Sequence, residues 1–196
     1  LKKLPTQYIG FSPEHKGFNG TISLSSNLIT SMIKEVGGQL SEMGFKRLIL
    51  INGHGGQISL LNTAARELRS FAPGMAVFPC FLWSGVNGLS ELLTKTEIEN
   101  GLHASLAETS LMLALKPELV GDQRPNEGIK GQIPDGWSLE GNAPTAWLTD
   151  DFSKSGVIGD SRGANESLGK NLKELLINHW FKLIMNLMQS DWPNNS

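Results

Sequence analysis

The segment Asn52-Gly53-His54-Gly55-Gly56 places an imidazole and a carboxamide in a glycine-rich loop directly after an apolar run. Glycine lets a ligand or a metal ion approach the backbone, and open α/β sheets bind ligands at the carboxyl ends of their strands. The loop therefore predicts a binding site that includes Asn52, His54, Gly55 and Gly56. The alternative is a glycine turn with a surface histidine. A phosphate-binding loop is a weaker alternative, because neither G-x-G-x-x-G nor a G-K-[ST] ending is present.

A second candidate is His103, which is followed by Glu108 near the start of an apolar segment with helical spacing. An imidazole just before a helix can act as a general base or bind an anionic group. The alternative is structural, since a carboxylate near a helix N-terminus is electrostatically favoured and Ser105 could cap the helix. The residues by themselves leave both interpretations open.

Several other side chains have less specific contexts. His15 lies in a turn-rich segment, where it could face the site or only hydrogen-bond the loop. Trp83 follows an apolar run and could cover a pocket or belong to the core. We expect a structural role for His179, which lies beside Trp180 on the last helical segment. Cys80 lies inside an apolar run and is expected to be a small buried hydrophobic residue.

The sequence offers no convincing nucleophile for covalent catalysis. A G-x-S-x-G elbow is absent and Cys80 has no basic neighbour in the sequence. A single cysteine also excludes zinc-finger spacing. Histidine and carboxylate ligands that hold a metal ion and activate water are the most economical chemistry that remains.

The elements that would position these residues alternate along the chain. Apolar spacing predicts a helix capped by Ser25 or Ser26 and ended by Gly44, and the run 46–51 predicts a strand covered on both faces. A second amphipathic helix follows the glycine loop and is broken at 73–74. The further predicted elements are a strand at 75–82, a helix at 106–115, irregular structure or short strands at 121–162, and a closing helix at 163–188.

This alternation indicates an α/β fold with a mostly parallel sheet and right-handed crossovers. We expect one domain over residues 1–190 and a loose tail at 191–196. The chain begins at Leu1-Lys2-Lys3-Leu4-Pro5, which reads like the middle of a protein. We therefore expect the chain to be truncated at its N-terminus.

The composition excludes several classes of protein. Of the 196 residues, 39% are hydrophobic and 18% charged, and the net charge is −2, which argues against disorder and against a nucleic-acid surface. No stretch approaches the roughly 20 apolar residues of a membrane span. The single cysteine fits a reducing cytoplasm, because no internal disulfide can form.

Four blocks in order resemble the creatininase family of amidohydrolases, from about residue 8 to residue 185. The loop 51–56 is similar to the family's Asn-Gly-His signature, and the segment 14–24 to its Phe-Pro-Gly-Thr block, with Asn19 replacing proline. His103-Ala104 followed by Glu108-Thr109-Ser110 matches the His-(Ala/Gly)…Glu-Thr-Ser block. The segment 155–162 is similar to the late Gly-Asp-Pro-Arg block, with Ser161 replacing proline.

The resemblance implies a three-layer αβα fold, often assembled as a hexamer, with one or two divalent ions (Zn, Mn or Fe) at the sheet edge. It implies that His54 is a metal ligand and that Glu108 binds the metal or the water that it activates. His103 would transfer the proton, and Trp83 lies near the position of a pocket-closing tryptophan. The implied activity is hydrolysis of a non-peptide C–N bond in an amide, cyclic amide or formamide.

The chain departs from the family pattern at three places. Creatininase itself has a metal-binding glutamate where this chain has Gly56, which points to the family's Gly-Gly branch, and Gln57 stands where that branch usually has asparagine. The family's early Glu-x-His and Asp ligands are expected before the counterpart of Leu1, and Glu14 and His15 are adjacent and belong to a later block. The resemblance therefore implies that the domain lacks its N-terminal strand and helix. The alternative function is therefore a non-catalytic homologue or small-molecule binding module with an incomplete metal shell.

Overall fold

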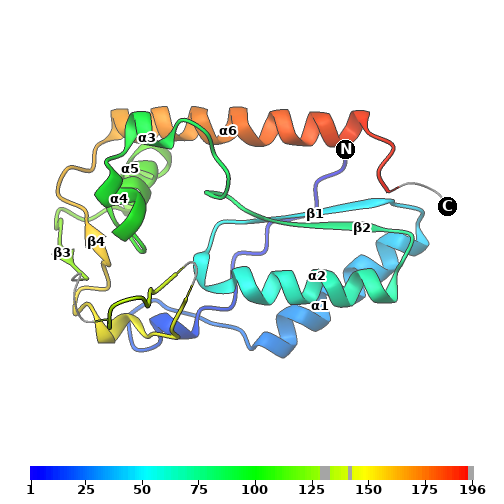
Figure 1. Ribbon diagram of the computed structural model, residues 1–196, viewed down its shortest axis with the longest axis horizontal. Coiled ribbons are helices and arrows are strands. Elements are labelled where there is room, and N and C mark those ends of the chain that lie inside the picture. Colours follow the sequence, from blue (N-terminus) through cyan, green and yellow to red (C-terminus); the bar gives the residue numbers. More distant parts are fainter. Residues whose placement is uncertain (129–132, 141–142, 194–196) are drawn as a thin grey trace. The chain divides into compact units, whose positions relative to one another are not determined.

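The computed structural model describes residues 1–128, 133–140 and 143–193 (Figure 1). The chain divides into two compact units, one formed by residues 1–84 and 184–196 and the other by residues 85–183. The end of the predicted tail, 194–196, and part of the segment predicted to be irregular, 129–132 and 141–142, lie outside the described residues. The single domain predicted over 1–190 stays a prediction.

The first unit is built on two parallel strands, β1 (Arg47–Asn52) and β2 (Ala76–Phe81), which pair from Arg47 opposite Ala76 to Asn52 opposite Phe81. The predicted strands and their parallel direction are confirmed, with bounds that differ by one residue. Parallel strands need a crossover connection, and the helix α2 (Ile58–Phe71) supplies it. Asn52 is the last residue of β1, so the glycine loop begins at the carboxyl end of the strand.

Helices α1 (Ser26–Glu42) and α2 pack against each other, and α2 packs on β2 (Figure 1). Ser25 caps α1, since its side chain accepts a hydrogen bond from the Leu28 amide, and Gly44 follows the helix with a φ of 89°. Both predicted ends of α1 are therefore confirmed. The core between the two helices and the strands contains buried aliphatic side chains, including Ile29, Ile33, Leu61, Leu68 and Met75.

The second unit contains α3 (Leu89–Leu92), α4 (Lys95–Asn100), α5 (Leu106–Leu115) and a two-stranded antiparallel sheet, β3 (Asn126–Glu127) and β4 (Gly159–Asp160). The closing helix α6 (Glu166–Gln189) begins three residues later than its predicted start.

The described residues of both units also form short 3-10 turns: η1 (Pro13–His15), η2 (Gly55–Gln57), η3 (Pro117–Leu119) and η4 (Thr149–Asp151). No helix in the described ranges is long and apolar enough to span a membrane.

Gly37 on α1 gives a stability test of the helix pair. A Cβ at this position would overlap Leu68 Cδ2, and the Leu68 side chain is fully buried. We expect Gly37→Ala to lower the free energy of unfolding by about 1–2 kcal/mol, because overpacking outweighs the gain in helix propensity. Denaturant unfolding measures the change.

The neighbouring Gly38 provides the matched control. A Cβ there would lie 3.0 Å from Cε1 of Phe71, whose ring is largely exposed and can swing away. Gly38→Ala should leave the stability unchanged or raise it by up to about 1 kcal/mol. A Gly37→Ala variant as stable as Gly38→Ala would contradict this account of the α1–α2 contact.

Candidate metal centre

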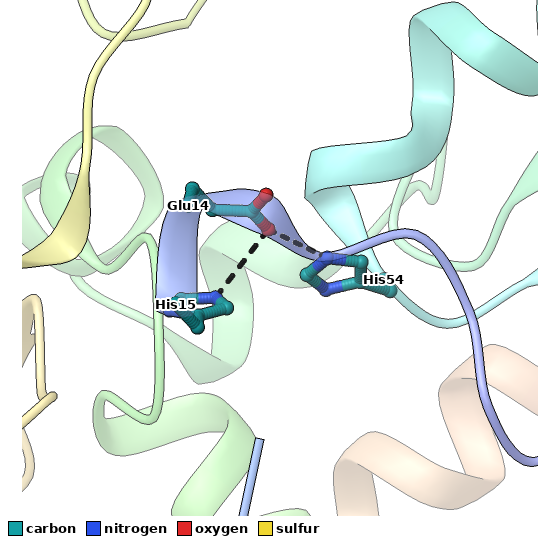
Figure 2. Close-up of side chains that lie close together, drawn as sticks. All are labelled: Glu14, His15 and His54. Carbon is teal, nitrogen blue, oxygen red and sulfur yellow. Dashed lines mark ion pairs between the residues drawn. The ribbon is translucent and has the colours of Figure 1, made fainter. Parts of the chain in front are cut away.

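Three potential ligands lie together in the first unit: Glu14, His15 and His54 (Figure 2). One ligand atom from each lies within 4.8 Å of the other two, and no other such group occurs among the residues that the structure describes. Glu14 and His15 belong to the turn η1, whereas His54 comes from the loop after β1. Two segments about 40 residues apart in sequence thus contribute to one cluster.

The carboxylate of Glu14 lies between the two rings. Its Oε1 is 2.7 Å from Nε2 of His54 and 3.6 Å from Nε2 of His15 (Figure 2). Oε1 also accepts a hydrogen bond of 3.3 Å from Ser12 Oγ. Ligands of a tetrahedral zinc ion, at roughly 2.0–2.2 Å from the metal, lie about 3.3 Å apart. The two carboxylate–imidazole separations bracket that value, so the donor set fits a small divalent cation.

The short contact between Glu14 and His54 is not a well-formed hydrogen bond. Although the two atoms are 2.7 Å apart, Nε2 of His54 is buried and has no hydrogen-bond partner of acceptable geometry among the described residues. A buried nitrogen without a partner costs free energy, because it has lost its water. A cation that accepts the lone pairs of both atoms would remove that cost.

The protonation states of the cluster suit a metal ion. Burial by itself would raise the pKa of Glu14, but its contact with the His54 ring, its own backbone amide and the nearby imidazoles prevail, and the pKa is lowered. Burial lowers the pKa of His15, and repulsion from His54 acts in the same direction against the attraction of Glu14. Glu14 is thus favoured as a carboxylate and His15 as a neutral imidazole, the forms that bind metals.

Gly56 determines whether the Glu14 carboxylate can occupy this place. A Cβ at position 56 would overlap Oε1 of Glu14 and lie 2.7 Å from Nε2 of His54. Any side chain here would therefore displace Glu14 from its position between the rings. Gly56, which was predicted as part of the binding site, lines the ligand cluster, and its contact with a substrate stays a prediction.

Asn52 holds the loop in shape. Its Oδ1 accepts hydrogen bonds from the His54 amide (2.9 Å) and from Gln57 Nε2 (2.9 Å), and its Nδ2 donates to the His54 carbonyl (2.8 Å). The side chain is 3% exposed. These bonds give Asn52 a structural task in orienting His54, and its predicted contact with a substrate remains untested.

His103 and Glu108 lie in the second unit, five residues apart at the N-terminus of α5. The backbone of His103 pairs with Ile158, donating to its carbonyl at 3.1 Å and accepting from its amide at 2.8 Å. Oε2 of Glu108 accepts the Ala104 amide at 2.7 Å. This hydrogen bond supports a structural role for Glu108 at the start of α5. A role for Glu108 at a metal ion stays a prediction.

Ser105 lies at the N-cap of α5, as the structural alternative proposed, but its side chain makes no capping hydrogen bond. Its hydroxyl donates to Oε2 of Glu97 (2.6 Å) rather than accepting from the helix. Oε1 of the buried Glu97 accepts the Ala107 amide at 2.8 Å. A carboxylate from α4 thus caps α5, because its charge makes it a stronger acceptor than a hydroxyl.

The remaining candidates have simpler surroundings. Trp83 is half-buried in the turn after β2, and its place at a pocket stays a prediction. Cys80 is half-buried in β2, and burial raises the pKa of its thiol, which opposes nucleophilic use. Glu14 was not among the ligands predicted from the sequence. The signal was available, since Glu14 is a carboxylate next to His15 in a turn-rich segment.

Taken together, the geometry defines an α/β protein with a buried carboxylate–imidazole cluster at the end of a parallel strand. The family model described as creatinine amidohydrolase matches residues 2–184. The chain belongs to the creatininase family, as the four sequence blocks predicted.

Curated relatives match over most of this chain but only part of their own length. The mycofactocin precursor peptide peptidase of Mycobacterium tuberculosis is 28% identical over 168 residues, which cover 86% of this chain and 59% of the relative. The creatinine amidohydrolase of Pseudomonas putida is 30% identical over 134 residues, covering 60% of this chain and 50% of the relative. The chain thus spans about half to three fifths of these relatives.

Solved structures share the fold. A creatinine amidohydrolase homologue from Bacteroides fragilis matches with a TM-score of 0.76 at 21% identity, over 94% of this chain and 71% of that one. A glutamate-to-glutamine mutant of creatininase, of the Zn-Zn type, matches with a TM-score of 0.68 at 24% identity, over 89% and 69%. The α/β fold class predicted from the sequence is confirmed as a creatininase fold.

Ala104, between His103 and α5, has a φ of 49°, which costs a non-glycine residue about 1–2 kcal/mol. We expect Ala104→Gly to leave the free energy of unfolding unchanged or to raise it by up to about 1 kcal/mol, because relief of strain offsets the added freedom of the unfolded chain. Ala107→Gly, within α5, should lower it by about 1 kcal/mol. Denaturant unfolding compares the two, and equal losses would contradict strain at Ala104.

Proposed function

We propose that this chain is the core of a metal-dependent amidohydrolase whose metal ion is held by Glu14, His15 and His54. The observation that supports this proposal most is the convergence of one carboxylate and two imidazoles, with a buried imidazole nitrogen that lacks a hydrogen-bond partner. Two histidines and one glutamate are a ligand set of catalytic zinc sites, which keep the fourth position open. Zinc is the metal we favour, with manganese or iron as alternatives.

The proposed reaction is hydrolysis of a C–N bond next to a carbonyl group, in an amide, a cyclic amide or a formamide. A divalent ion supplies a Lewis acid for the carbonyl oxygen and makes hydroxide available near neutral pH. Glu14 contributes negative charge to the site, and His15 and His54 contribute imidazole nitrogens as ligands. We propose that His103 delivers a proton to the leaving nitrogen and that Glu108 binds the metal ion or orients the water that it activates, as the family resemblance implies.

The names of the relatives support this reaction class more than any one substrate. A peptidase and a creatinine amidohydrolase both break an amide C–N bond. Because Gly56 stands where creatininase has a metal-binding glutamate, it favours a substrate of the family's Gly-Gly branch over creatinine. We propose that Asn52, Gly55 and Trp83 contact a small amide substrate. We also propose that the protein is a homo-oligomer and works in a reducing cytoplasm.

The metal site can be tested directly. We expect the protein to bind one zinc ion per chain, and we expect Glu14→Gln and His54→Ala each to weaken binding by more than about 100-fold, because each removes a ligand. Elemental analysis after gel filtration and a competition titration with a chromophoric chelator measure content and affinity. His179→Ala is the control histidine substitution and should bind zinc normally. Wild-type zinc affinity in both ligand variants would refute the site.

Turnover separates an enzyme from a binding module. We expect His103→Asn to keep wild-type zinc affinity while lowering kcat by about 10²–10⁴-fold on a panel of small amides, cyclic amides, formamides and short peptides. Zinc removal by a chelator should abolish turnover in the unsubstituted protein. If the zinc-loaded protein binds members of the panel without hydrolysing any of them, the non-catalytic alternative is favoured.

A further inference from the structure

We propose that Gln57 is a positioning residue that sets the spacing between the two loops of the candidate metal centre. Its carboxamide connects the segment that carries Glu14 and His15 with the loop that carries His54. This inference rests on the metal site proposed above, and it assigns a task to a side chain that is not itself a ligand.

The connection runs across 46 residues of sequence. Oε1 of Gln57 accepts the backbone amide of Phe11 at 3.1 Å, and Nε2 of Gln57 donates to Oδ1 of Asn52 at 2.9 Å. One end of the carboxamide thus contacts the backbone three residues before Glu14. The other end contacts the asparagine that orients His54.

Asn52 connects the Gln57 carboxamide to the proposed ligand His54. The same Oδ1 that accepts from Gln57 also accepts the His54 amide at 2.9 Å, and Nδ2 donates to the His54 carbonyl at 2.8 Å. A continuous series of hydrogen bonds therefore leads from the Phe11 backbone to the His54 backbone. Networks of this kind orient metal ligands, and their loss usually weakens metal binding.

The segment near Phe11 has its own anchors. The carbonyl of Gly10 accepts the Leu24 amide at 2.8 Å, and the Ser12 amide donates to Ser23 Oγ at 2.8 Å. These bonds tie the residues before Glu14 to the stretch before α1. Gln57 adds the link between this anchored segment and the glycine loop, so it determines the distance between Glu14 and His54.

The space beside Gly10 fits the Gln57 carboxamide and the length of the Gln57 side chain. A Cβ on Gly10 would lie 2.6 Å from Oε1 of Gln57, so only glycine leaves room for the carboxamide at this place. A side chain shorter by one methylene would withdraw the carboxamide by about 1.5 Å and could not reach Phe11 and Asn52 together. The glycine and the glutamine therefore form a matched pair.

The experiment uses Gln57→Met, which keeps the length of the side chain and removes both hydrogen bonds, and Gln57→Ala. For each variant, zinc affinity is measured by chelator competition, the Co²⁺ absorption spectrum reports ligand geometry, and denaturant unfolding of the metal-free protein reports stability. Gln7→Ala is the matched control, since Gln7 is exposed and its side chain bonds only the nearby Ile9 carbonyl.

We expect both Gln57 variants to weaken zinc binding by about 10–100-fold and to alter the Co²⁺ spectrum, with Gln7→Ala unchanged in both. Gly10→Ala should weaken zinc binding in the same direction, because its Cβ pushes the carboxamide aside. In a Gln57→Ala background the Gly10→Ala effect should vanish, because no carboxamide remains to be displaced. A merely structural Gln57 would lower stability and leave the affinity and spectrum of the folded protein unchanged.

Wild-type zinc affinity and an unaltered Co²⁺ spectrum in Gln57→Met would overturn the positioning role and leave the metal site intact. Full additivity of Gly10→Ala and Gln57→Ala would also overturn it. If Glu14→Gln and His54→Ala bind zinc as the unsubstituted protein does, the metal site itself fails, and the inference about Gln57 fails with it.

Discussion

The contact between the Glu14 carboxylate and the His54 ring is the constraint on which the rest of the site depends. Gathering lone-pair donors in a buried place costs free energy, and here Nε2 of His54 has lost its water and has no hydrogen-bond partner among the described residues. The surrounding chain permits this arrangement, since Gly56 leaves room for the Glu14 carboxylate and Asn52 holds the backbone of His54 by two hydrogen bonds. Such an arrangement is expected where a cation provides the missing stabilisation.

The fold provides two kinds of support for that contact. The strand β1 ends at Asn52, so the glycine loop starts from a paired and well-fixed point. The turn with Glu14 and His15 does not follow directly on a strand, and hydrogen bonds to neighbouring loops hold it in place. Gln57 is the side chain that joins these two supports, which explains why a residue that touches no ligand can govern their spacing.

The loop around His103 is held in its conformation by a different kind of contact. Glu97 and Glu108, two carboxylates, hold backbone amides at the start of α5, and Ala104 adopts a left-handed conformation between them. Charged acceptors of this kind hold a strained backbone in one conformation. In both loops proposed to take part in the reaction, side-chain hydrogen bonds to backbone groups add to the support that the neighbouring strand or helices give.

The sequence by itself determined the family and the main helices and strands of the first unit, whereas α3 and α4 were not predicted. Periodic apolar residues, the Ser25 cap, Gly44 and the two apolar runs were sufficient for α1, β1, α2 and β2, because such signals are local. His54 also emerged from its glycine-rich context. The tertiary structure decided that Glu14 and His15 lie beside His54 and that Glu97 rather than Ser105 caps α5. Contacts between residues far apart in sequence depend on how the loops fold onto each other, and no local pattern records that.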